Sequence, residues 1–122
     1  MIDSILTDVK IFIGITEEDK NFDSDIIRLI NSEFSVLALK GLGPKTGFKI
    51  KDDKAVWSDI LQNDDLLNMV PEYVSIRVKL AFDPPASSSI LSALTDRTKE
   101  LEFYISTLVD PEANRTEVET ND

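Results

Sequence analysis

The spacing of apolar residues predicts two helices in the first third of the chain. Across residues 2–13 apolar side chains recur every three or four positions, which is the period of an amphipathic helix. Asp3 or Ser4 can cap the start of this helix. The same period continues over residues 22–37 after a polar stretch, and Gly41 follows as a typical helix end. We therefore expect a short first helix and a long second helix.

Helical periodicity is lost between residues 41 and 53. Three glycines and a proline interrupt this stretch, and apolar and basic residues alternate in its second half, as in a short extended segment. We interpret it as a loop or small hairpin that projects from the fold and lies outside the core. The candidate contact residues of this projecting loop are Lys45, Phe48, Lys49 and Lys51.

The second half of the chain predicts a short helix or turn and then two long helices. The short element is indicated by Trp57, Ile60 and Leu61. Apolar residues at helical spacing then cover residues 66–81 and residues 90–108. The expected fold is all-α: a small bundle of about four main helices, with a long mobile loop between the second and the third. Residues 1–109 form a single helical domain in this interpretation, and residues 110–122 form a flexible acidic tail.

The predicted third helix is apolar around much of its circumference. Pro71 interrupts its pattern, which a first turn tolerates and which elsewhere kinks a helix. Four apolar residues fall outside its main stripe, namely Met69, Ile76, Val78 and Phe82. Such a helix is buried on several sides. The covering surface can come from the other helices or from a neighbouring subunit, and the sequence leaves both possibilities open.

Composition excludes several kinds of chemistry. The chain has no cysteine and no histidine, which removes disulfides, thiolate nucleophiles, imidazole bases and the two commonest zinc ligand types. We expect no enzymatic activity, no cofactor and no metal. The first residues lack a basic leader, and no apolar run reaches the length of a membrane span, so we expect a soluble protein that is made and kept in the cytoplasm.

The formal net charge of −10 argues against the basic surface that sequence-independent DNA binding requires. The charge is uneven, because residues 40–54 hold five lysines against two aspartates. This asymmetry fits either a contact surface or an ordinary solvated loop.

Two short motifs resemble ligand-binding loops and fail at decisive positions. Asp19, Asn21, Asp23 and Asp25 alternate as in an EF-hand, but serine and isoleucine stand where the calcium loop needs glycine and glutamate. The glycine-rich stretch at residues 41–47 follows a helix, and its spacing fits neither the dinucleotide motif nor the P-loop.

The corner between the last two helices has two possible structures. Asp83 can cap the last helix with Pro84 and Pro85 in its first turn. Alternatively the prolines form a turn and a serine from residues 87–89 is the cap. In both cases Asp83, Pro84 and Pro85 have a structural role.

Part of the sequence resembles a known family. The stretch YVSIRVKLAFDPP at residues 73–85, followed by Leu94 and by Glu-Leu-Glu at residues 100–102, is similar to the C-terminal half of the head-tail connector, or adaptor, proteins of tailed bacteriophages. The first half resembles them in its helical pattern, so the resemblance covers roughly residues 2–108. One departure is that Phe103 and Tyr104 are not followed by the arginine that related chains often carry here.

The resemblance implies a structural virion protein without catalysis. Such subunits form a ring, typically twelvefold, at the head-tail junction under the portal protein, and a stopper or tail-completion protein lands on them. The ring extends the channel through which genomic DNA passes without specific binding, and no membrane is involved. Within this hypothesis the candidate subunit-interface residues are Tyr73, Ile76, Arg77, Val78 and Phe82. The loop is then a projecting contact, and the acidic tail docks on the portal or on the next ring.

Two other classes of function remain as alternatives. A small acidic regulator or DNA mimic that binds a partner protein would use the same negative surface and would stay monomeric or dimeric. A metal-dependent enzyme using the aspartates of residues 19–25 would gain thermal stability from calcium or magnesium.

Overall fold

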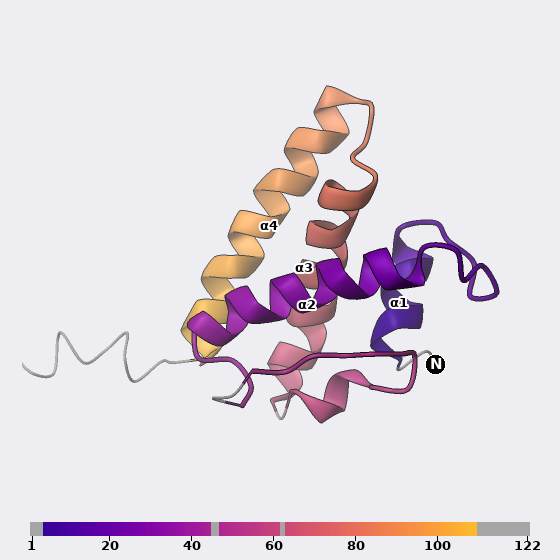
Figure 1. Cartoon of the computed structure of the whole chain (residues 1–122). Coiled ribbons are helices and arrows are strands. Elements are labelled where there is room, and N and C mark those ends of the chain that lie inside the picture. Colours follow the sequence, from indigo (N-terminus) through magenta and orange to yellow (C-terminus); the bar gives the residue numbers. More distant parts are fainter. Residues whose placement is uncertain (1–3, 45–46, 62, 110–122) are drawn as a thin grey trace, which may run out of the picture.

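The computed structural model describes residues 4–44, 47–61 and 63–109, and within them the fold is all-α (Figure 1). Four α-helices follow one another: α1 (Ile5–Phe12), α2 (Asp23–Leu39), α3 (Asp64–Phe82) and α4 (Ser88–Val109). A short 3-10 helix, η1 (Trp57–Asp59), precedes α3. The predicted fold class, the four main helices and the short element at Trp57 are confirmed. The predicted acidic tail, residues 110–122, lies outside the described residues.

Local signals in the sequence set the first two helices. The Ser4 hydroxyl accepts a hydrogen bond from the Thr7 amide at 3.2 Å, so Ser4 is the cap of α1. The end of α2 is followed by Gly41 at φ +97°, a left-handed conformation that glycine adopts without strain. Two aspartates in the first turn of α2 complement the positive end of its dipole.

Helix α3 is the centre of the molecule, because it contacts each of the other three helices. Figure 1 shows α2 lying across α3, while α4 returns beside it. Pro71 lies inside α3, beyond its first turn. The Asn63 side chain caps the start of α3 by accepting hydrogen bonds from the Asp65 and Leu66 amides at 2.7 and 3.3 Å.

The corner between α3 and α4 uses a serine cap. Asp83 is the C-terminal cap of α3, and its amide donates a hydrogen bond to the Lys79 carbonyl at 2.8 Å. The Ser87 hydroxyl accepts from the Ile90 amide at 3.4 Å, and the Ser87 carbonyl accepts from the Leu91 amide. The interpretation of Asp83 as the cap of the last helix is therefore wrong, and the serine alternative holds. Pro84 and Pro85 lie between the helices and not in the first turn of α4.

The connection between α2 and α3 lies partly in the core. Within the predicted loop, residues 41–53, the side chains of Leu42 and Ile50 are buried, contrary to the prediction, while Lys49 and Lys51 are exposed. The short element holds three further buried side chains, Trp57, Ile60 and Leu61. The Asn31 side chain on α2 holds both backbone groups of Ile50, accepting from its amide at 2.8 Å and donating to its carbonyl at 2.9 Å. The prediction of a mobile loop outside the core finds no support in the described residues, because hydrogen bonds and buried side chains fix the chain here.

Candidate functional site

Three of the five predicted interface residues lie inside the subunit. Tyr73, Ile76 and Val78 are each no more than 2% exposed. Their side chains pack against the other helices of the same chain, so they have no surface left to bury against a neighbour. The circumference of α3 that suggested a subunit contact is thus covered from within the subunit at these three residues.

The remaining two predicted interface residues keep part of their surface. The Arg77 side chain is 45% exposed and pairs with Glu33 of α2 at 3.3 Å. Phe82 is half-buried, and its ring stands edge-on to Phe22 with the ring centroids 5.4 Å apart. Both contacts join α3 to α2, so these residues hold two helices together as well as facing outward.

A polar seam runs between α2, α3 and α4 around the Tyr73 hydroxyl. Burial raises the pKa of Tyr73, the nearby carboxylates of Glu102 and Glu33 raise it further, and Arg77 opposes this. Lys40 at the end of α2 pairs with Glu102 at 3.1 Å. The seam therefore favours the neutral form of Tyr73, which lies among charged groups from three helices. Such an arrangement links the helices to one another.

A buried lysine organises the turn between α1 and α2. Lys10 is 1% exposed, and its ammonium donates to the carbonyls of Glu17 and Asp19 at 3.1 and 2.7 Å. It also lies 2.8 Å from Oδ1 of Asp23, a buried oxygen with no other partner among the described residues. Oxygens from two positions of the calcium-like motif thus face an ammonium group. The sequence analysis missed this residue, although the spacing of Leu6, Lys10 and Ile13 places it on the buried face of α1.

A second polar contact that the sequence analysis missed joins the 3-10 helix to α1. The indole N–H of Trp57 donates to the Asp8 carboxylate at 2.9 Å, across 49 positions of sequence. The Asp59 carboxylate accepts from the Val56 amide at 2.9 Å. No local pattern signals the contact between Trp57 and Asp8, because the two residues come together only in the folded chain.

The predicted loop contacts are divided between core and surface. Phe48 is half-buried, with its ring edge-on to Phe34 of α2 at 5.6 Å between centroids. Lys49 and Lys51 are exposed, and Lys45 lies outside the described residues. The two exposed lysines border a hollow of about 720 Å³, which we call the lysine hollow; its lining is Asn31, Phe48, Lys49, Ile50, Lys51, Asp52, Lys54, Ala55 and Asp59.

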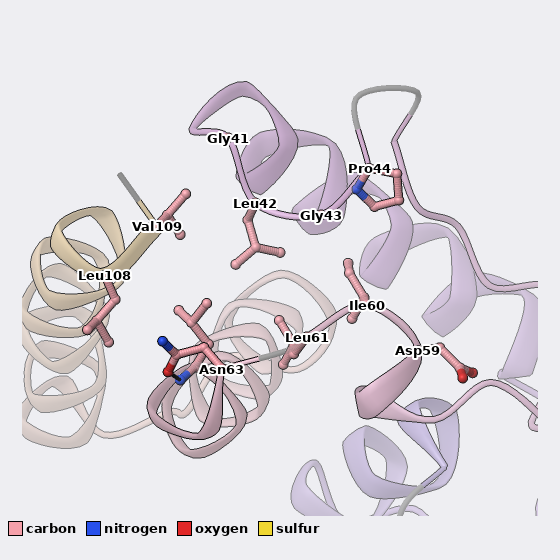
Figure 2. Close-up of a pocket in the computed structure, with 11 residues that line it drawn as sticks. Gly41, Leu42, Gly43, Pro44, Asp59, Ile60, Leu61, Asn63, Leu108 and Val109 are labelled. Atoms are coloured by element: carbon pink, nitrogen blue, oxygen red, sulfur yellow. Dashed lines mark hydrogen bonds between the residues drawn. The ribbon is translucent and has the colours of Figure 1, made fainter. Parts of the chain in front are cut away.

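A smaller cavity of about 380 Å³ lies where the end of α2, the start of α3 and the end of α4 meet (Figure 2). The glycine-rich stretch forms one side of it. A side chain at Gly43 would place its Cβ 3.1 Å from the Ile60 side chain, and Gly43 has a φ of +81°. Glycine at position 43 therefore allows its backbone to approach the segment that contains Ile60 closely. We call this space the α4-end cavity.

Several large apolar side chains face solvent at the two ends of α4. Ile90 and Leu91 lie near its start, with 53% and 39% exposure. Phe103 and Tyr104 lie near its end, where Leu39 of α2 is 89% exposed. The ion pair between Lys40 and Glu102 brings the end of α2 to this part of α4. We call Ile90 and Leu91 the tip surface, and Leu39, Phe103 and Tyr104 the base surface.

Among the described helices, none is both long and apolar enough to cross a lipid bilayer. The described residues also contain no group of three or more acidic side chains arranged to hold a metal ion.

Comparison with known proteins assigns the family. The model of the phage connector protein family matches residues 5–112, which covers all four helices. The chain therefore belongs to the phage connector protein family and is a connector-type structural protein. No curated protein and no solved structure matches it.

Proposed function

We propose that the chain is a head-tail connector subunit that assembles as a ring under the portal, extends the DNA channel and joins capsid to tail. The family match over residues 5–112 carries this proposal. The proposed ring holds twelve copies, lies at the head-tail junction of the virion, and is built from subunits made in the bacterial host cytoplasm. Its proposed partners are the portal protein on one side and a stopper or tail-completion protein on the other.

The base and tip surfaces are the proposed contacts between neighbouring subunits. A closed ring of identical subunits is built head to tail, so two different surfaces must meet at each interface. The two surfaces begin thirteen positions apart on α4, at Ile90 and Phe103, which corresponds to about 20 Å along a helix. Exposed aromatic and aliphatic side chains of this kind are the usual anchors of protein interfaces.

In this proposal the subunit has no catalytic role. The sequence contains neither cysteine nor histidine. The buried charged groups Lys10 and Asp23 neutralise each other, and the polar seam around Tyr73 ties helices together. These observations support a protein whose polar interior serves folding and assembly.

The acidic charge suits a channel for DNA. A chain with a net charge of −10 repels phosphate groups at short range, so a ring of such chains lets duplex DNA slide without adhering. The base and tip surfaces carry the assembly, and the charge acts on the DNA that passes.

Deleting the gene from a phage that encodes the chain tests the proposal. We expect heads and tails to accumulate unjoined, and supplying the wild-type gene from a plasmid should restore joined particles. An acidic regulator, the alternative function, would change the number or timing of particles and leave each one complete. Normal numbers of joined, infectious particles without the gene would contradict the connector function.

A further inference from the structure

The lysine hollow carries three cations without a partner. Most described lysines and arginines make an ion pair or a carbonyl contact: Lys10, Lys20, Arg28, Lys40, Arg77, Lys79 and Arg97. Within the described residues, Lys49, Lys51, Lys54 and Lys99 have none, and the first three line the hollow together with Asp52 and Asp59. Unpaired cations gathered around one depression indicate a site for a negatively charged partner.

The frame of the hollow is fixed, and its floor is apolar. Asn31 holds the backbone of Ile50, and the Asp52 carboxylate accepts from the Lys54 amide at 2.9 Å. Phe48, Ile50 and Ala55 supply the apolar part of the lining. An extended peptide has side chains that alternate between two directions, so it can place apolar residues on such a floor and acids against the lysines.

The end of α4 borders a cavity next to this hollow. Leu108 and Val109 line the α4-end cavity, and Asp59 lines its far side (Figure 2). Asp59 also lines the lysine hollow. The two depressions are therefore neighbours, and the chain that continues after Val109 starts at the edge of the first.

The sequence that follows Val109 has the matching chemistry. Residues 110–122 contain five acids and one arginine, and Val118 stands between Glu117 and Glu119. Glu117 and Glu119 follow Val109 by eight and ten residues, which span about 26 and 33 Å when extended, so the segment can pass from one depression to the adjacent one. Its acids match the unpaired lysines, and its valine matches the apolar floor.

We propose that residues 110–122 dock on the same chain, cross the α4-end cavity and place Glu117 and Glu119 against Lys49, Lys51 and Lys54, with Val118 on the floor of the lysine hollow. The docked segment covers the unpaired cations of this part of the chain. It thereby keeps DNA phosphates from adhering to this lysine-lined depression of an acidic subunit. This inference stands whether or not the subunits form a ring.

Zero-length carbodiimide cross-linking of the full-length protein tests the proposal, because it joins lysines to carboxylates that touch. An equal mixture of ¹⁴N- and ¹⁵N-labelled protein is cross-linked at low salt, and the joined peptides are identified by mass spectrometry. We expect Glu117 and Glu119 joined to Lys49, Lys51 or Lys54, in peptides of a single isotope. Cross-links to the exposed Lys99 and to the half-buried Lys79 serve as the internal control and should be at least about tenfold weaker.

Three results would overturn the proposal. Equal cross-link yields at Lys79, at Lys99 and at the lysines of the hollow would show that residues 110–122 touch the surface without a preferred site. Joined peptides of mixed isotope would show that a second copy supplies the segment. Absence of any cross-link from residues 110–122 would also reject docking.

Matched charge variants distinguish binding at the lysine hollow from general electrostatic attraction between the acidic segment and surface lysines. The triple variant K49E/K51E/K54E should remove the salt dependence of the amide NMR signals of residues 110–122. The triple variant K20E/K79E/K99E has the same change in charge and should leave this salt dependence unchanged. Equal effects of the two variants would contradict a defined site. The wild-type protein can also be mixed with duplex DNA at low salt. If the DNA binds at the lysine hollow while residues 110–122 form no cross-link to it, the hollow binds phosphate and the proposed occupant is wrong.

Discussion

Lys10 determines how the chain passes from α1 to α2. Its ammonium satisfies two carbonyls of the connecting turn and the buried oxygen of Asp23 at the start of α2. Removing one member of a buried pair leaves the other charge without compensation, and this penalty exceeds the value of the contact itself. The buried lysine therefore ties the turn to both helices.

The variant K10A should lower the free energy of unfolding by about 2–4 kcal/mol, since it leaves Asp23 and two carbonyls unpaired. The matched control is K20A, because the Lys20 side chain is 61% exposed and its ammonium lies 4.0 Å from Asp53. This change should alter the free energy of unfolding by no more than about 0.5 kcal/mol. Urea unfolding followed by circular dichroism measures both. Equal losses in the two variants would show that Lys10 is not a special contact.

Tyr73 should make stability depend on pH in the alkaline range. Its pKa is raised in the folded protein, so its contribution to stability is complete below the unfolded value of about 10 and is lost as the pH rises through the folded pKa. The comparison is the free energy of unfolding of the wild type and of Y73F at pH 8 and at pH 11. The wild type should lose more stability than Y73F between these pH values, and other alkaline effects cancel in the difference. A difference that does not change with pH would contradict the raised pKa.

At the scale of elements, the corner between α3 and α4 fixes the direction in which α4 leaves. Ser87 is the cap, and Asp83 ends the preceding helix. The variant S87A should lower the free energy of unfolding by about 0.5–1 kcal/mol, because the first turn of α4 loses its side-chain acceptor. The control D83A should change it by less than about 0.5 kcal/mol. A larger loss in D83A than in S87A, measured by urea unfolding, would support the other capping arrangement.

The elements that the sequence predicted well are those with local signals. Helical periodicity and adjacent caps placed α1, α2 and α4 within a few residues of their observed ends. The packing of the α2–α3 connection was not predictable in this way, because Asn31 and Ile50 meet across 19 positions. Periodicity marked Tyr73, Ile76 and Val78 as buried, but it could not show that the covering surface belongs to the same chain. Lys10 was missed because a charged residue was assumed to face solvent.

At the scale of the whole molecule, the proposed assembly uses apolar side chains that the folded subunit leaves exposed. The base surface holds the two most exposed of them, Leu39 at 89% and Phe103 at 68%. These side chains make little contact within the subunit, so they can be changed without loss of folding.

The double variant L39S/F103S should weaken the contact between neighbouring subunits, and with it ring assembly on the portal, at least about tenfold, because truncating interface anchors typically costs more than 1 kcal/mol each. Its free energy of unfolding should stay within about 1 kcal/mol of the wild type, since both side chains are exposed. The matched control is I11S, an exposed apolar residue on α1 at 47% exposure, which should assemble normally. Weakened assembly in I11S as well would show that surface hydrophobicity in general, and not the base surface, drives association.

The central claim is that this connector-family chain forms a ring on a portal. Native mass spectrometry of the purified chain, alone and mixed with a purified portal ring from the same phage, tests it most directly. The account predicts a complex that contains one portal ring and about twelve copies of the chain, and that forms without partial intermediates at saturation. A monomer or dimer that leaves the portal ring unchanged in mass would contradict it and would favour an acidic regulator.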